Sequence, residues 1–335
     1  MGRRPDSGNL PHGSVSGSAI VTLTVNPALD VTVDADDVRP TDKIRCRAVR
    51  YDAGGGGVNV ARFAHALGVP VSAVFTVGGP TGAHVVALVD HSEVPSLPIT
   101  VSGHTRQSLT VNECATGRQY RFVLPGPALT PEEQIRCLDV LSDVAGSAEY
   151  VVASGSLPPG VRPDFYQQVA DICGRQGARL ILDTSGGGLA HISSGVFMLK
   201  PSVRELRECV GRPLDTEAEQ TTAARELIDR GVAEMVVVSL GAEGALLVTA
   251  RSSHRYAAID VPSVSGVGAG DAMVAGIVVG LARKWPVPVA VRYGIAAATA
   301  KLQTPGTSAF VQSDVDGYFD GIDAKGTAGR PVRSR

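Results

Sequence analysis

The chain has 335 residues, of which 44% are hydrophobic and only 4% aromatic, and its formal net charge is −2. This length is enough for one large α/β domain or two small ones. A nearly neutral chain with no long basic run and few aromatic side chains is not expected to bind nucleic acid. The five cysteines are scattered, and no apolar run reaches the roughly 18 residues of a membrane span. We therefore predict a reduced, cytoplasmic protein that does not cross a membrane.

The two ends of the chain differ in composition from the rest. Residues 1–17 are rich in Gly, Ser, Arg and Pro and lack the apolar segment of a signal peptide. Residues 323–335 are similar. We predict a disordered tail at each end and a folded region over residues 18–322.

The N-terminal half predicts two kinds of strand. Continuous apolar runs at 19–25 and 71–77 are typical of buried parallel strands. Strands with alternating polar residues, which suit a half-exposed sheet, are expected at 31–38, 43–51, 107–114 and 119–123. We interpret these four as one small antiparallel sheet, built from excursions of the chain at about 31–52 and 105–124.

A run of glycines, Gly54–Gly57, follows the first excursion and opens a helix that ends near Gly68. A flexible turn is the simplest explanation of such a run. Its place at a helix start, with Asn59 just inside the helix, favours a loop that approaches a ligand closely. Because GxGxxG and GxxxxGK[ST] are both absent, neither a dinucleotide fingerprint nor a P-loop is indicated.

Beyond Pro125, helices and strands alternate, which predicts a parallel sheet with helices on both faces. We expect strands at 150–153, 179–183, 196–199 and 235–240, and a hairpin at 244–249 and 255–259. Helices are expected at 131–144, 163–175, shortly after Ser185, and at 203–210, 217–230, 288–302 and 313–321, with a further helix that begins around Asp271 and runs to about residue 284.

Polar residues gather after the strands of this predicted sheet. In open α/β sheets, ligands bind beyond the carboxyl ends of the strands. The residues expected there are Asp30 in the loop after the first strand, Asp183, Lys200, Ser202, Glu205, Ser239 and Gly241. This gathering indicates an enzyme. The histidines lack zinc-site spacing, and Ser154 lacks a GxSxG context, so neither a zinc site nor a serine hydrolase is expected.

The most informative stretch is 264–280, a loop of small residues that becomes an apolar helix. Gly268, Ala269 and Gly270 place free N–H groups at the helix start, where they favour an anion. Asp271 stands directly beside them. It is either a helix N-cap or a base that takes a proton from a hydroxyl as a phosphoryl group arrives.

These features together resemble the PfkB, or ribokinase-like, sugar kinases over about residues 20–319. Two signatures carry the resemblance: Gly54-Gly-Gly-Gly-Val-Asn59 and Val267-Gly-Ala-Gly-Asp-Ala272. The stretches 23–30, 120–126, 154–161 and 237–241 support it. Gly56 stands where 1-phosphofructokinases and tagatose-6-phosphate kinases usually carry a lysine, which favours the 6-phosphofructokinase branch of the family.

The resemblance implies a three-layer α/β/α core with a small β-sheet lid, and homodimers formed through the lids. It implies transfer of phosphate from Mg-ATP to the C1 hydroxyl of fructose 6-phosphate, with Asp271 as base and Gly268, Ala269 and Gly270 as anion hole. Whether potassium is also needed stays open.

Further site residues are implied position by position. Asp30 and Asn59 would hold sugar hydroxyls, and Lys43 with Arg106 would bind the 6-phosphate. Gly55, Gly56, Gly57 and Ser154 would complete the substrate site. Lys200 would contact ATP phosphates, Ser239 and Gly241 would lie near the nucleotide together with Gly268 and Gly270, and Glu205 would orient magnesium through water.

Two departures from the family pattern keep alternatives open. Ser202 replaces the asparagine of an Asn-x-x-Glu motif near magnesium, and Gly266 replaces a polar residue before the anion hole. The acceptor is therefore fructose 6-phosphate or, alternatively, tagatose 6-phosphate or fructose 1-phosphate. A non-catalytic sensor of sugar phosphates or nucleotides is the alternative from another class.

Overall fold

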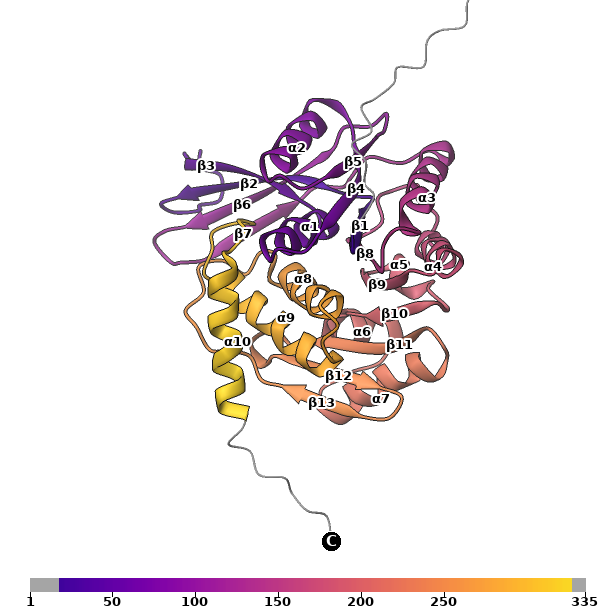
Figure 1. Ribbon diagram of the computed structural model, residues 1–335. Helices are drawn as coiled ribbons and strands as arrows, with labels where there is room; N and C mark the ends of the chain where they lie inside the picture. Colours follow the sequence, from indigo (N-terminus) through magenta and orange to yellow (C-terminus); the bar gives the residue numbers. More distant parts are fainter. Residues whose placement is uncertain (1–17, 327–335) are drawn as a thin grey trace, which may run out of the picture.

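The computed structural model describes residues 18–326, so the predicted tails at 1–17 and beyond 326 lie outside the described residues. The buried apolar strands form one nine-stranded sheet in the order β13-β12-β11-β10-β9-β8-β1-β4-β5 (Figure 1). The strands from β5 to β11 in this order run parallel, and β12 and β13 form the predicted antiparallel hairpin. Its strands are β1 (Ile20–Thr24), β4 (Val71–Val77), β5 (Ser96–Thr100), β8 (Tyr150–Ser154), β9 (Arg179–Asp183), β10 (Val196–Leu199), β11 (Ala233–Ser239), β12 (Ala245–Thr249) and β13 (Ser253–Tyr256).

Helices cover both faces of this sheet, as predicted, and each face has its own hydrophobic core (Figure 1). One face packs against α1 (Gly56–Ala66), α2 (Gly79–His91), α8 (Ala269–Ala282), α9 (Val287–Leu302) and α10 (Gln312–Gly326). The other packs against α3 (Pro131–Ala145), α4 (Phe165–Gln176), α5 (Gly187–Ala190), α6 (Val203–Val210) and α7 (Glu217–Asp229). A short 3₁₀ helix, η1 (Gly241–Glu243), follows β11. The predicted three-layer architecture is confirmed.

The small sheet is present, but the prediction that it is wholly antiparallel is wrong. Its order is β3-β2-β6-β7, with β2 (Ala28–Ala35), β3 (Arg47–Gly54), β6 (Arg106–Glu113) and β7 (Gln119–Val123). The central pair, β2 and β6, is parallel, and only the outer pairs are antiparallel. The reason is topological: β2 continues from β1 and β6 follows β5, so both leave the same edge of the main sheet, and each then turns back.

Three local boundaries also differ from the prediction. The edge strand β5 was not expected, because Pro98 interrupts its pattern; an edge strand tolerates proline since one side needs no ladder hydrogen bonds. The strand predicted from residue 43 begins at Arg47, after a turn in which Thr41 has a φ of 67°. Helix α10 runs to Gly326, beyond the predicted start of the C-terminal tail.

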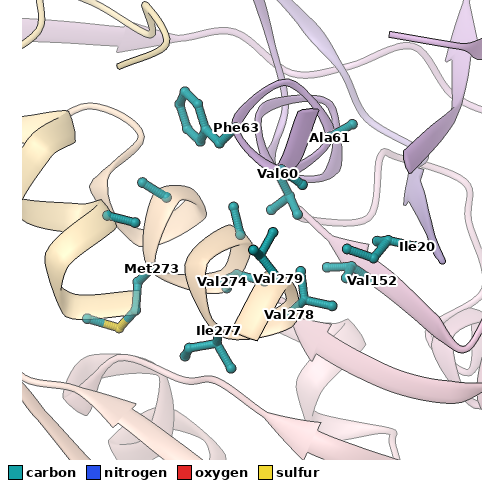
Figure 2. Packing of buried hydrophobic residues seen from close by; sticks show 14 of the residues in the cluster. Ile20, Val60, Ala61, Phe63, Val152, Met273, Val274, Ile277, Val278 and Val279 are labelled. Atoms are coloured by element: carbon teal, nitrogen blue, oxygen red, sulfur yellow. The ribbon is translucent and has the colours of Figure 1, made fainter. Parts of the chain in front are cut away.

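Helix α8 is the buried element that places the predicted catalytic loop. Figure 2 shows its side chains between α1 and the sheet, where Val278 lies beside Ile20 and Val152. Small residues let it approach α9 closely: a Cβ added to Gly276 would lie 2.8 Å from the Cα of Gly294. A helix fixed so tightly by apolar packing holds its N-terminus in one position relative to the sheet edge.

Candidate active site

The glycine loop before α1 is packed too closely to be a simple flexible turn. Gly55 has a φ of 111°, and a Cβ there would lie 2.8 Å from Thr24 Cγ2. A Cβ on Gly56 would lie 2.1 Å from Ser154 Oγ, and one on Gly57 would lie 2.5 Å from Thr24 Oγ1. These contacts exclude side chains and bring the loop against the ends of β1 and β8.

Asp271 lies in the first turn of α8, but it is not the N-cap. That position is taken by Gly268, in the left-handed region at a φ of 80°, and no side chain caps the helix. The first intrahelical bond runs from the Ala272 N–H to the Gly268 carbonyl at 2.8 Å, so the Gly270 and Asp271 amides precede it. The Ala269 N–H donates only a long bond, 3.4 Å, to Gly266 O. The N-cap interpretation of Asp271 is therefore wrong, and its carboxylate stands beside free amides.

Asn59 connects the two sequence signatures. Its Nδ2 donates a hydrogen bond to Asp271 Oδ2 at 2.8 Å, from α1 to α8. Its buried Oδ1 has no hydrogen-bond partner among residues 18–326. A buried polar atom of this kind needs a partner, and a sugar hydroxyl in the site would supply one.

The pKa of Asp271 is raised to about 7, first by burial and second by the nearby charge of Asp183. The hydrogen bond from Asn59 and the charge of Lys200 act in the opposite direction. A carboxyl group whose pKa lies close to neutrality suits general acid–base chemistry at physiological pH.

Lys200 lies after β10 and faces the anion hole. Its Nζ is 3.1 Å from Asp183 Oδ1, in an ion pair with little solvent exposure. A Cβ on Gly270 would lie 3.6 Å from the same Nζ. Burial alone would lower the pKa of Lys200, but Asp183, Glu205 and Asp271 raise it overall, so the ammonium stays charged. A fixed positive charge beside free amides can hold phosphate groups.

Ser202 and Glu205 begin helix α6 and form a capping box. Ser202 Oγ accepts from the Glu205 N–H at 3.2 Å, and Glu205 Oε2 accepts from the Ser202 N–H at 2.8 Å. The Ser202 hydroxyl thus acts as a helix cap, which weakens its predicted role as a metal ligand. Residues 18–326 contain no cluster of three His, Cys, Asp or Glu side chains that could hold a metal ion. Glu205 with phosphate oxygens and water fits magnesium, which keeps several waters.

Asp30 and Arg106 form the lid side of the site. Asp30 lies within β2, not in a loop as predicted, and a Cβ on Gly54 would lie 2.3 Å from its Oδ2. Burial raises the pKa of Asp30 to about 6, although the Arg106 charge opposes the shift. Arg106 donates to Asn26 O and Leu124 O, and its buried Nε has no partner within the described part of the chain.

Some of these residues line one cavity at the carboxyl edge of the main sheet. A cavity of about 170 Å³ is lined by Gly56, Ser154, Gly155, Ser156, Asp183, Thr184, Ser185, Glu205 and Asp271. It joins the glycine loop, the ends of β8 and β9, and the start of α8 in one space. Of the residues that the sequence predicts at this edge, Asp183 and Glu205 line the cavity together with Asp271, and Lys200 reaches it through its ion pair with Asp183.

Three other residues predicted to bind substrate or nucleotide do not line this cavity. Lys43 is exposed in the loop between β2 and β3 and forms none of the ion pairs found in residues 18–326. Gly241 is exposed at the start of η1, and Ser239 at the end of β11 pairs with Ser202 in a β-bridge. Two charged residues were missed as site candidates. The sequence places Asp183 at the ligand-binding edge but gives it no role, and no sequence motif marks Lys301 on α9.

Comparison with known proteins places this arrangement in a family. Residues 22–314 match the model of the pfkB family of carbohydrate kinases. The chain belongs to this family, and its three-layer core is the ribokinase-like fold.

Individual relatives are similar over nearly the whole chain. The ATP-dependent 6-phosphofructokinase isozyme 2 of Mycobacterium tuberculosis is 61% identical over 301 residues, covering 90% of this chain and 89% of the relative. Escherichia coli phosphofructokinase-2 in complex with fructose-6-phosphate has a TM-score of 0.85 at 35% identity, covering 91% of this chain and 99% of that one. The same enzyme in complex with potassium has a TM-score of 0.87 at 36% identity, with the same coverage.

Proposed function

We propose that the chain transfers the γ-phosphoryl group of ATP to the C1 hydroxyl of fructose 6-phosphate, giving fructose 1,6-bisphosphate and ADP. The observation that carries this proposal is the position of Asp271 beside the free amides that begin α8. The 61% identity to a 6-phosphofructokinase supports the choice of substrate. The activity is that of a phosphotransferase with an alcohol group as acceptor.

Asp271 acts as the general base. The C1 oxygen forms a bond to the γ-phosphorus as the bond to the β-phosphate bridging oxygen breaks, and the hydroxyl proton passes to the Asp271 carboxylate. Negative charge on the transferring group is stabilised by the Gly268–Gly270 loop and by Lys200. Asn59 holds the base in place through the bond to its Oδ2.

The sugar phosphate lies between the lid and the glycine loop. Asn59 Oδ1 and the Asp30 carboxylate accept hydrogen bonds from sugar hydroxyls, since the first is a buried, unpartnered acceptor. The unpartnered Nε of Arg106 donates to the 6-phosphate. Lys43 reaches the same phosphate only if its exposed loop moves toward the site, so Arg106 provides the main cationic contact.

ATP binds as its magnesium complex on the other side of Asp271. Lys200 binds its phosphates, while Ser239 and Gly241 line the approach of the nucleotide after β11. Glu205 would orient water around magnesium with Oε1, the oxygen outside the capping box, which pairs at 3.5 Å with the exposed Arg204. Magnesium neutralises the charge of the phosphates when bound, and the other contributions come from the side chains named above.

The lid sheet supports a homodimer. Its register aligns Tyr51, Val31, Leu109 and Phe122 across the four strands on one face. Tyr51 and Phe122 remain 47% and 53% exposed, a large apolar surface for an isolated chain. Pairing of two lids would cover it.

A cytoplasmic location fits substrates that are phosphorylated sugars and ATP. Separately, no helix in residues 18–326 is long and apolar enough to cross a membrane.

The test is ADP release with Mg-ATP and a panel of acceptors: fructose 6-phosphate, tagatose 6-phosphate, fructose 1-phosphate, fructose, ribose and adenosine. We expect the highest kcat/KM with fructose 6-phosphate. A higher kcat/KM with another acceptor would identify that acceptor as the substrate and leave the proposed mechanism unchanged. No turnover by folded protein with any acceptor would favour the sensor, which binds sugar phosphate without transfer.

A further inference from the structure

Lys301 is a fully buried lysine near the C-terminal end of helix α9, and it is the one charged residue among the buried residues of that helix. Its exposure is 0%, and it is among the largest completely buried side chains of the chain. It takes part in none of the ion pairs formed by residues 18–326. Burying a charge without a direct counter-ion is costly, so an unpaired lysine in this position needs an explanation.

Neutral oxygens hold the ammonium group instead of a carboxylate. Lys301 Nζ donates to Thr304 Oγ1 at 2.7 Å and to Thr304 O at 3.3 Å. The loop that supplies these oxygens is itself ordered by the single Thr304 hydroxyl hydrogen, which Lys301 O and Ser308 O share at 3.0 and 3.1 Å from Oγ1. Carbonyl and hydroxyl oxygens arranged around one positive charge are also the ligands that a dehydrated alkali cation takes.

The ammonium lies directly behind the anion hole. A Cβ added to Gly268 would lie 3.4 Å from Lys301 Cε. The loop before Gly268 is tied to the residue after the lysine, because the Val264 and Ser265 N–H groups both donate to Leu302 O, at 2.7 and 3.3 Å. Lys301 therefore supports the loop that receives the transferring phosphoryl group.

The charge on Lys301 interacts with the carboxylate of Asp271. Burial lowers the pKa of Lys301 to about 8, and Arg50 and Arg62 contribute in the same direction. The carboxylates of Asp52 and Asp271 oppose this shift. At neutral pH the ammonium is thus mainly charged, and its Cε lies next to Gly268, the residue that precedes α8. A positive charge there strengthens the field on the transferring phosphoryl group.

We propose that the Lys301 ammonium serves as a built-in monovalent cation behind the anion hole, so that the reaction needs no free potassium or other monovalent cation. Lys301 is a positioning residue: it contacts neither substrate nor reacting atoms, and it acts through the Gly268 loop. This inference rests on the proposed kinase reaction at Asp271. It resolves the question of potassium that the family resemblance leaves open.

The first experiment uses the unmodified chain. Initial rates and thermal melting are measured in buffers whose only monovalent cation is tetramethylammonium, with potassium, ammonium or sodium then added at constant ionic strength. We expect rates that differ by less than about twofold and a melting temperature that potassium does not raise more than sodium does. Saturable activation by potassium of several-fold would overturn the proposal.

The second experiment replaces the cation. Lys301→Met keeps an unbranched side chain to the ε position, with sulfur in place of the δ methylene, and removes the ammonium. We expect kcat to fall about 100-fold without potassium, at the lower end of the ~10²–10³ loss that follows removal of one charge-stabilising group. Added potassium or ammonium should restore most of it in a saturable way, and potassium should now raise the melting temperature. Lys284→Met is the matched control, because Lys284 is exposed and pairs with Glu149 away from the site.

Two results with the variant contradict the proposal. Full activity of Lys301→Met without monovalent cations would show that the charge is not used. A loss that neither potassium nor ammonium restores, in folded protein, would show that the lysine acts only through packing. If the variant does not fold, the cation series on the unmodified chain decides. Absence of turnover in every buffer would count against the proposed function, while the melting data would still test the cation site.

Discussion

Asn59 donates a hydrogen bond to Asp271 across 2.8 Å, joining the first turns of two helices that are more than 200 residues apart in sequence. Each helix carries one of the two glycine signatures. The bond uses Asp271 Oδ2 and leaves Oδ1 available to accept a proton, so the amide fixes the orientation of the carboxylate. The free amides at the start of α8 then lie beside a base of fixed direction.

Replacing Asp271 with Asn tests the base directly. The amide has almost the same shape and cannot take a proton at neutral pH. We expect kcat to fall by about 10²–10⁴, the usual share of general-base catalysis, while KM for both substrates changes little. Steady-state kinetics measure both values. Near-normal turnover in this variant would remove Asp271 from the mechanism.

The pH profile follows from the raised pKa of Asp271. Because that pKa is about 7 in the free protein, the carboxyl becomes protonated as the pH falls below 7, and a protonated group cannot act as base. We expect kcat/KM to decline towards about tenfold per pH unit on the acid side. The residual activity of Asp271→Asn is the control, since substrate phosphate also titrates near pH 6. An equally steep acid limb in that variant would assign the decline to another group.

The sequence predicted the parallel core and the helix-start position of Asp271 because both depend on local patterns: apolar strand runs and glycines before a helix. It could not predict that β2 and β6 pair in parallel, since strand pairing depends on where distant segments leave the main sheet. The sequence also places Asp30 in a loop, because Asn26-Pro27 marks the end of β1 and does not show that β2 already begins at Ala28. The role of Lys301 was invisible because its partners lie in a loop without a recognisable motif.

Arg106 is predicted to decide affinity for the phosphorylated end of the sugar. Arg106→Gln keeps some hydrogen-bonding capacity but loses the charge. A charge-assisted contact contributes about 1.5–3 kcal/mol, so we expect KM for fructose 6-phosphate to rise about 10- to 100-fold. Turnover of unphosphorylated fructose should be little affected. Arg118→Gln, in the exposed turn between β6 and β7, is the control. Equal losses with both acceptors would mean that Arg106 supports the lid and not the phosphate.

Ser202 is predicted to act as a helix cap. Ser202→Ala removes the Oγ acceptor of the capping box and should lower the free energy of unfolding by about 1 kcal/mol, with KM for Mg-ATP unchanged. Ser202→Asn should retain stability, since asparagine caps equally well. Thr216→Ala, in the similar capping box of α7, gives the reference loss away from the site. Urea unfolding and magnesium titrations measure the two effects. An alanine variant of normal stability with a raised magnesium requirement would return Ser202 to the metal site.

The apolar face of the lid is predicted to hold two chains together. Phe122 is 53% exposed on β7, in register with Leu109 of β6. Phe122→Glu places a charge on this face at the β7 edge of the sheet, and burying it in a dimer would be costly. We expect sedimentation to show a dimer for the unmodified chain and a monomer for the variant. Val311→Glu is the matched control, because Val311 is 60% exposed but precedes α10, outside the lid. If Phe122→Glu stays dimeric while Val311→Glu dissociates, the interface lies near α10 and the lid face must have another use.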